Sequence, residues 1–357
     1  MLHDYLSRLN DVVDPAHAER SERLMLAATS FEQVDRFPVI VACPVEGWQA
    51  FSYREGFHDM EKMMVNELAA VWAGARVRDD RAFTIRAYYG VGIIPTMFGC
   101  KVELTGDDIP PWFHPLSDDE LDRVLDAGPA DINAGLGARV FETETFYMDI
   151  LSRYDNLAKC VHVYLCDTQG PFDLAHLVMG TRIYTDIYDN PERVHRLLDL
   201  VSDVCIRFVL AQKELIGEGC DTSYHTQMLL RGAVRLCNDT GINLSTDVFR
   251  EFARPYDERV LAAVNGGWVH YCGNGKQILG DVLSTPNLTG INFGNPEMQD
   301  VEQVLRAAQP SRVALLLWPR HLAIPEWVTT GVTLTASAAD LESAAAMLVH
   351  TEERSDS

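Results

Sequence analysis

The chain has 357 residues, of which 47% are hydrophobic and 23% charged, the balance of a globular protein with a sizeable core. Its formal net charge of -22 argues against binding to nucleic acid or to an anionic membrane surface, because both require clustered Lys and Arg. A small anionic substrate is not excluded, since a local basic pocket can exist inside an acidic protein.

No basic segment followed by an apolar stretch opens the chain, so the sequence predicts no secretory signal. No run of about 18 apolar residues predicts a membrane span. The eight cysteines are spread along the chain without dense spacing, which is typical of reduced thiols and not of a disulfide framework. We therefore expect a cytoplasmic protein that acts on a small molecule.

Apolar spacing over about residues 1–30 predicts an N-terminal helical extension. A long helix begins at Pro191, where proline suits the first turn, and ends near Gly217. Ser245 and Ser337 are expected to cap two later helices. In chain order, the predicted strands are 36–42, 82–89, 161–166, 220–224, 233–237, 268–271, 288–292, 312–317 and 332–335, and the other predicted helices are 59–76, 141–154, 246–264, 276–283, 300–308 and 338–349.

Alternation of strands and helices on this scale predicts a parallel sheet. The length and the number of strands favour closure into a single (β/α)8 TIM barrel over residues 1–350. No Gly-x-Gly-x-x-Gly follows the first strand, which weakens a dinucleotide-binding alternative. The short polar segment 351–357 is predicted to be a disordered tail.

A series of short motifs resembles the uroporphyrinogen decarboxylase superfamily. The series consists of Gly-Pro-Phe-Asp-Leu-Ala at 170–175 with Gly180, Asn-Pro-Glu-Arg-Val at 190–194, Asn-Asp-Thr-Gly at 238–241, Leu-Ser-Thr at 244–246, Glu251-Phe252, Pro255-Tyr256 and His-x-Cys-Gly-Asn at 270–274. Each motif is loose, and their order over about residues 30–350 carries the resemblance. It implies a barrel fold and either a decarboxylase or a zinc methyltransferase that works with a corrinoid protein. It is also compatible with a homodimer.

Two departures from the superfamily pattern matter. Uroporphyrinogen decarboxylases have an Arg-rich stretch that holds substrate carboxylates, but the matching segment here is Cys-Pro-Val-Glu-Gly-Trp at 43–48, where Glu46 would repel a polycarboxylate. In the methyltransferase branch, His270 and Cys272 match two zinc ligands. The third ligand, a cysteine expected near 332–334, is absent, and no cysteine follows Cys272. A zinc site would have to be completed differently.

His270 and Cys272 are two residues apart at the end of an apolar strand, so both side chains can project from the same side of the backbone. A thiolate and an imidazole together suit Zn²⁺. The competing interpretation is that Cys272 is a small buried hydrophobic residue and His270 a satisfied residue at a strand end.

Asp239 directly follows a predicted strand, where it can complete a metal shell, act as a general base or anchor a substrate. The alternative is a turn residue ahead of Gly241. His225 and Glu297, which also follow strands, are further catalytic candidates, and a surface loop fits each of them equally well. His321 is another candidate ligand, for which a purely structural role fits better than a ligand role. The residues expected to bind substrate at the barrel mouth are Glu46, Trp48, Tyr88, Tyr89, Asp167 and Asn238.

Three functions remain open. The leading hypothesis is a metal-assisted methyltransferase that moves a methyl group between a small methylated compound or thiol and a corrinoid. A partner protein would supply the corrinoid, since the chain lacks an Asp-x-His-x-x-Gly motif. The second is a metal-independent decarboxylase or lyase for a small carboxylated substrate, with Asp239 as the acid and base. The third is a non-catalytic subunit that binds a corrinoid or another small molecule.

Overall fold

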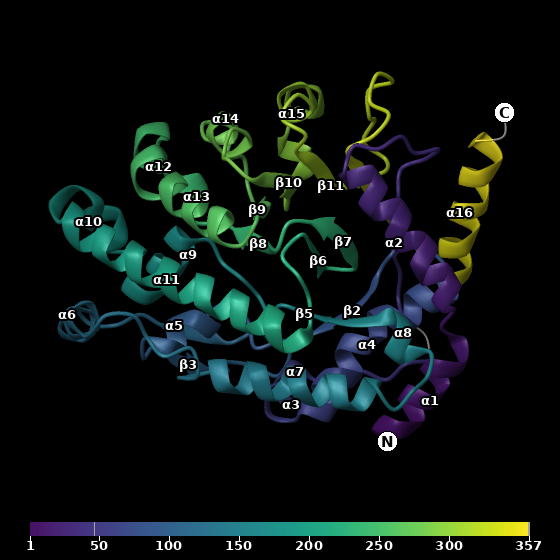
Figure 1. The fold of residues 1–357 in the computed structure, drawn as a ribbon, viewed down its shortest axis with the longest axis horizontal. Helices are drawn as coiled ribbons and strands as arrows, with labels where there is room; N and C mark the ends of the chain where they lie inside the picture. The colour runs from purple at the N-terminus through teal and green to yellow at the C-terminus, as the bar shows by residue number, and fades with distance from the viewer. Residues whose placement is uncertain (46, 356–357) are drawn as a thin grey trace.

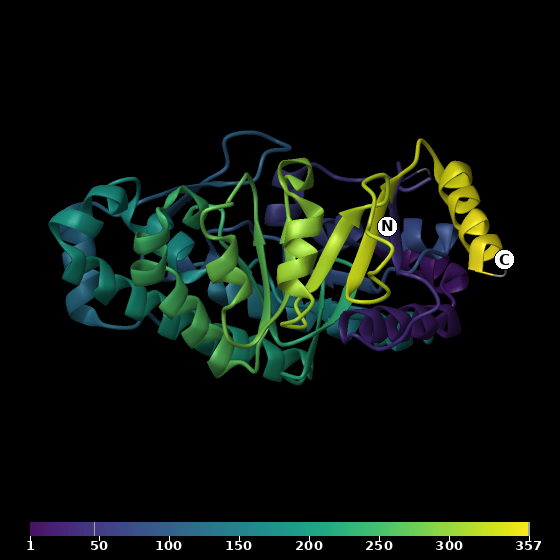
Figure 2. The same ribbon diagram turned by 90° about the horizontal axis from the view of Figure 1, so that it is seen from above.

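A computed structural model describes residues 1–45 and 47–355, with side chains as far as Leu348, and shows strands surrounded by helices (Figures 1 and 2). Within this range eight strands are joined by parallel pairings, six of them in one sheet of order β1-β12-β11-β10-β9-β8 and two in the pair β2-β5. The predicted α/β barrel class is therefore confirmed. The barrel strands are β1 (Val39–Ala42), β2 (Phe83–Arg86), β5 (Val161–Tyr164), β8 (Val234–Cys237), β9 (Gly267–Tyr271), β10 (Leu288–Phe293), β11 (Ala314–Pro319) and β12 (Val332–Ser337).

The junction between β1 and β2 is made largely by side chains. Asp79 Oδ2 accepts a hydrogen bond from Val41 N at 2.8 Å, and Asp80 Oδ2 accepts one from Val39 N at 2.9 Å. Arg81 in turn donates to the carbonyl of Val41 at 2.6 Å. These three residues precede β2 and satisfy β1 backbone groups that would otherwise be buried without partners.

The junction between β5 and β8 is formed by the segment that follows β5. Gly170 N donates to the carbonyl of Cys237 at 2.8 Å, and Gln169 forms a parallel bridge with Cys237. A Cβ atom at Gly170 would lie 1.8 Å from Asn238 Oδ1, so only glycine permits this approach. The barrel is thus closed beside the carboxyl end of β8.

A β-hairpin made of β6 (Thr222–His225) and β7 (Met228–Arg231) lies in the middle of the ring of barrel strands (Figure 1). The sequence predicts a strand here but not its role, because β6 pairs antiparallel with β7 instead of joining the barrel. Met228 and Leu230 of the hairpin are buried against Ile40 and Trp268 on the barrel strands. The hairpin therefore fills the amino-terminal end of the barrel with apolar side chains.

The long helix α11 (Pro191–Ile216) confirms the prediction from Pro191, and Gly217 ends it in the left-handed conformation with φ 72°. None of the helices described is long and apolar enough to cross a bilayer. The remaining helices are α1 (Leu2–Val12), α2 (Pro15–Thr29), α3 (Tyr53–His58), α4 (Met60–Val77), α5 (Ile93–Met97), α6 (Asp118–Ala127), α7 (Gly137–Leu151), α8 (Leu157–Cys160), α9 (Pro171–Met179), α10 (Ile183–Asp189), α12 (Thr246–Phe252), α13 (Arg254–Ala263), α14 (Leu279–Leu283), α15 (Val301–Ala308) and α16 (Leu341–Ser355), and a second hairpin pairs β3 (Lys101–Glu103) with β4 (Trp112–His114).

Two helix predictions need correction. The single helix expected over 246–264 is divided at Ala253 into α12 and α13, because Pro255 has no backbone N–H and its ring obstructs a continuous helix. Ser245 caps α12 as expected, but α16 begins at Leu341, where Asp340 and not Ser337 accepts a backbone hydrogen bond, from Ser343 N. Helix α16 also runs into the segment 351–357, whose disorder stays a prediction.

Candidate active site and metal centre

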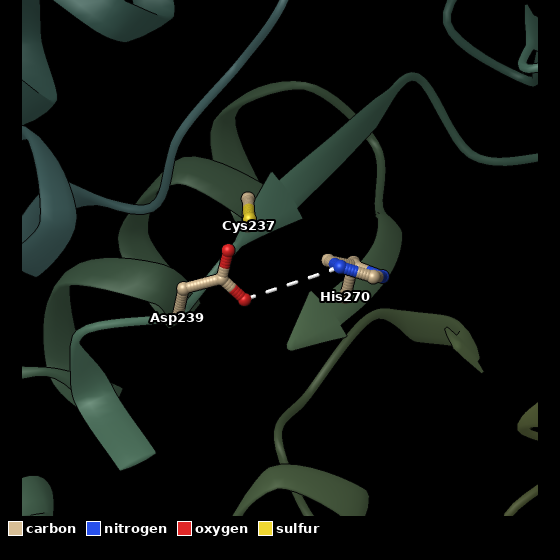
Figure 3. A group of neighbouring side chains, drawn as sticks. All are labelled: Cys237, Asp239 and His270. Atoms are coloured by element: carbon tan, nitrogen blue, oxygen red, sulfur yellow. Dashed lines mark ion pairs between the residues drawn. The ribbon is translucent and has the colours of Figure 1, made fainter. Parts of the chain in front are cut away.

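Three potential metal ligands meet at the carboxyl ends of the neighbouring strands β8 and β9. Cys237 is the last residue of β8, Asp239 follows two positions later, and His270 lies on β9 in register with Cys237. One ligand atom from each residue lies within 4.8 Å of the other two, and Figure 3 shows the side chains converging. This end of the strands is where barrels of this kind hold their active sites.

The orientation of His270 is fixed by a hydrogen bond. Its Nδ1 donates to Asn292 Oδ1 at 2.6 Å, and Asn292 Nδ2 donates to the carbonyl of Leu316 at 2.8 Å, which sets the direction of the amide. Burial lowers the pKa of His270, so the imidazole is neutral near pH 7. The lone pair of Nε2 is then available on the side that faces Asp239 and Cys272.

Cys272 lies beside the same group and is exposed. Its Sγ is 3.5 Å from His270 Nε2, and its backbone N donates to Asp239 Oδ1 at 2.6 Å. Partial burial, with the Asp239 carboxylate nearby, raises the pKa of Cys272 to about 11, and burial raises the pKa of Cys237 as well. Both residues are therefore thiols at neutral pH unless a divalent cation displaces their protons.

The donor set fits zinc. Sulfur, imidazole nitrogen and carboxylate oxygen bind Zn²⁺ at about 2.0–2.3 Å, which puts ligand atoms of a tetrahedral site roughly 3–4 Å apart. His270 Nε2 is 3.9 Å from Asp239 Oδ1 and 3.5 Å from Cys272 Sγ. No cysteine follows Cys272 in the sequence, but Cys237 on the adjacent strand offers a second thiol.

Two arginines occupy the barrel interior next to this group. Arg235 NH2 and Arg86 NH1 contact the carboxylate of Asp167 at 2.5 and 3.2 Å. Burial alone would raise the pKa of Asp167, but Arg235 and Arg86 outweigh it and hold that pKa below its usual value. Arg86 also lies near the buried carboxyl of Glu67, which accepts its backbone N–H. The planar forks of the two guanidinium groups can nevertheless bind an anionic substrate group.

The backbone between Cys237 and Asp239 is anchored to the helices behind β8. Asn238 Nδ2 donates to Asp257 Oδ2 on α13 at 2.6 Å, and Thr240 N donates to Asp173 Oδ1 on α9 at 2.8 Å. Burial raises the pKa of Asp173 to about 8 and that of Asp257 to about 7. These two carboxyl groups retain protons at pH values where exposed carboxyl groups have lost them.

The raised pKa of Asp257 predicts a specific pH dependence of stability. Between its usual pKa near 3.8 and about 7, folded Asp257 holds a proton that the unfolded chain has released, so stability falls as pH rises through this window. The variant Asp257→Asn should show a smaller loss of unfolding free energy than the wild type between pH 5 and pH 7.5 in urea titrations. Asp126→Asn, at an exposed position, should follow the wild type. An unchanged pH slope in Asp257→Asn would contradict the burial effect.

Of the predicted site residues, the structure brings together His270, Cys272 and Asp239. Asp167 lies next to the cluster and contacts both Arg86 and Arg235. Tyr88 is half-buried, with the centre of its ring 4.5 Å from the Arg86 guanidinium.

The other predicted residues are not part of the ligand cluster. Trp48 and Tyr89 are buried in the hydrophobic core, where Trp48 Nε1 donates to the carbonyl of Val65 and Tyr89 OH bonds to Thr143. Asn238 serves the backbone anchor described above. His225 is buried between the rings of Tyr164 and Trp268, close enough to Arg235, Arg86 and His270 for their charges to act on it. Glu297 is exposed and accepts a hydrogen bond from Asn295, and His321 is exposed after β11. Glu46 lies outside the described residues.

Cys237, Arg86 and Arg235 were not among the site residues predicted from the sequence. A signal was present in Val234–Cys237, since a strand period of two puts Arg235 and Cys237 on one face. The register that sets Cys237 beside His270 is visible only in the folded barrel. Arg86 likewise ends β2, and its pairing with Asp167 depends on the contact between β2 and β5.

Comparisons with known proteins agree with this architecture. The family model described as "Uroporphyrinogen decarboxylase (URO-D)" matches residues 20–316. No curated protein matches the chain. Among solved structures, a methyltransferase from Methanosarcina mazei has a TM-score of 0.67 and 18% sequence identity, covering 93% of this chain and 98% of that one. At this identity the likeness concerns the fold alone, and it supports the barrel.

Proposed function

This chain belongs to the uroporphyrinogen decarboxylase family, and from that premise we propose that it is a methyltransferase. The proposed reaction moves a methyl group between a small methylated compound or thiol and a corrinoid carried by a partner protein. The observation that carries the proposal is the convergence of Cys237, Asp239 and His270 within 4.8 Å, with the Cys272 thiol beside them.

In this proposal His270, Cys237 and Asp239 hold a zinc ion, with Cys272 as a further thiol ligand. Bound zinc would keep a substrate thiol in the thiolate form at neutral pH. Asn292 orients the imidazole, and the Asp257–Asn238 bond holds the backbone on which two of the ligands lie. The side chain of Asp239 is 44% exposed, so its carboxylate can pass the proton of an arriving thiol to water.

Metal analysis of the purified protein tests the ligand set. We expect about one equivalent of zinc in the wild type, and a loss of most of it in Cys237→Ser, because a hydroxyl is a much poorer zinc ligand than a thiolate. Cys205→Ser is the matched control, since Cys205 is also buried but lies outside the cluster. Less than about a tenth of an equivalent in the wild type would contradict a zinc site.

The methyl transfer itself can be followed with methylcobalamin and a panel of small thiols. A thiolate sulfur forms the new S–C bond while the Co–C bond breaks, and the electron pair stays on cobalt, so the visible spectrum changes to that of cob(I)alamin. We expect turnover with zinc-loaded wild type and none with Cys237→Ser. Zinc-loaded protein inactive with thiols, and equally inactive in the reverse direction with methyl ethers and methylamines, would contradict methyl transfer.

The arginine pair favours a second candidate, a decarboxylase for a small carboxylated substrate. Arg86 and Arg235 can hold a substrate carboxylate, and Asp239 can exchange a proton at the reacting carbon. This function predicts activity that survives chelation of metal and is lost in Asp239→Asn. Full turnover of Asp239→Asn would remove its central residue.

A further inference from the structure

A cavity of about 540 Å³ lies between helices α2, α4 and α16. None of its lining residues belongs to the metal-ligand cluster. Its lining includes Arg36 and Asp80, which precede strands β1 and β2, so it sits at the amino end of the barrel. The candidate metal centre is at the carboxyl ends of the parallel strands. The two sites are therefore at opposite ends of the barrel.

The cavity is basic in a strongly acidic protein. Its charged lining consists of four arginines and one carboxylate: Arg20, Arg36, Arg76, Arg78 and Asp80. Arg36 makes two hydrogen bonds to Asp80, at 2.6 and 2.7 Å, and Arg78 pairs with Asp14 at 2.9 Å. Among the side chains that the structure describes, two guanidinium groups remain without a carboxylate, in a chain whose net charge is -22.

Those two guanidinium groups belong to Arg20 and Arg76. Arg20 is exposed on α2 and has no ion pair or hydrogen bond within the described residues. Arg76 has no carboxylate partner there either, and its guanidinium lies 5.5 Å from the centre of the Trp72 ring. Both therefore keep their donors available to a bound anion.

The helix dipole explains only part of this arrangement. Arg76 lies in the last turn of α4 and Arg78 is its C-cap, positions where a positive charge offsets the partial negative charge of the helix end. Arg20 is on the neighbouring helix α2 and Arg36 is in the loop before β1. Four arginines from three segments thus face one cavity, which helix capping alone does not require.

The rest of the lining consists of four apolar residues, Leu24, Val77, Ala345 and Leu348, and of His17 and Ser21, whose polar side-chain atoms are bonded to the carbonyl of Asp79. A volume of about 540 Å³ lies within the range of small-molecule sites, which is roughly 300–1,000 Å³. Arginine binds phosphate oxygens through its planar fork of N–H donors. We propose that this cavity binds a small phosphorylated ligand of nucleotide size, with phosphates on Arg20 and Arg76 and an apolar body against Leu24 and Leu348. The proposal does not depend on the reaction catalysed at the other end.

Calorimetric titration of the full chain with ATP and with tripolyphosphate tests this proposal, in EDTA and at constant ionic strength. We expect saturable one-to-one binding of ATP that weakens by about tenfold or more in Arg20→Glu, and further in the double variant Arg20→Glu/Arg76→Glu. Arg23→Glu is the matched control. It makes the same change of charge on the same helix, but Arg23 pairs with Glu19 and does not line the cavity.

If ATP binds more tightly than tripolyphosphate, the apolar wall contacts the body of the ligand. If the two affinities are equal, the site binds phosphate groups alone, and the apolar contact is removed from the proposal. Equal weakening in Arg20→Glu and Arg23→Glu would mean diffuse attraction to charge and would overturn the site. Absence of saturable binding to wild type would overturn it as well. Unchanged melting temperatures of the variants confirm that they remain folded.

Discussion

Replacing His270 with alanine is expected to weaken zinc binding by roughly a hundredfold or more, which corresponds to about 2.7 kcal/mol. His270 supplies the nitrogen that lies between Asp239 and Cys272, at 3.9 and 3.5 Å from their ligand atoms. Its removal leaves only carboxylate and thiol ligands, and the proposed set of zinc ligands is then incomplete. Competition with a chromophoric zinc chelator measures the change.

The control for this prediction is Asn292→Ala. Asn292 is not one of the proposed zinc ligands but accepts the Nδ1 hydrogen of His270, so its loss should reduce zinc affinity through orientation alone, by about tenfold to a hundredfold. The effect of His270→Ala should exceed that of Asn292→Ala. Zinc affinity in His270→Ala within threefold of the wild type would show that the imidazole is not a ligand.

The largest expected effect on stability comes from Asp79→Ala, at the junction of β1 and β2. Asp79 is fully buried, pairs with the buried guanidinium of Arg81 and accepts the backbone hydrogen of Val41. Removing one partner of a buried ion pair leaves the other charge without compensation, which costs about 3–5 kcal/mol. We expect a loss of this size in the free energy of unfolding, measured by urea titration.

Two further variants make this test decisive. Asp79→Asn retains an oxygen that can accept from Val41 N, so its loss should be smaller than that of Asp79→Ala. Asp149→Ala removes an exposed ion pair with Arg153 and should cost less than about 0.5 kcal/mol. If Asp79→Ala and Asp149→Ala cost the same, the side-chain closure of the barrel would contribute little to stability.

Hydrophobic patterns were sufficient for the barrel because its eight parallel strands are short β-rich runs, most of them separated by helices. These patterns failed where tertiary contacts determine how a segment pairs. The run at 220–224 has the pattern of a barrel strand, but β6 pairs with β7, since the antiparallel hairpin buries Met228 and Leu230 inside the barrel. The break between α12 and α13 was readable from Pro255 alone.

The candidate site was predictable where its residues are close in sequence. His270 and Cys272 are two residues apart, and Asp239 follows a strand, so their meeting at one edge follows from the barrel itself. Cys237 depends on the register between β8 and β9. Trp48 and Tyr89 follow strands too, but their rings are buried in the core. The direction of these side chains is determined by packing and cannot be predicted from the strand pattern.

The β6–β7 hairpin also constrains how reactants meet. Because Met228 and Leu230 close the amino-terminal end of the barrel, a molecule that reaches Cys237 must enter past the loops at the carboxyl ends and leave by the same route. A bulky protein partner docked over those loops would trap whatever lies beneath it. If the proposed corrinoid protein docks there, the small reactant has to bind before it arrives, and the product can depart only after it has dissociated.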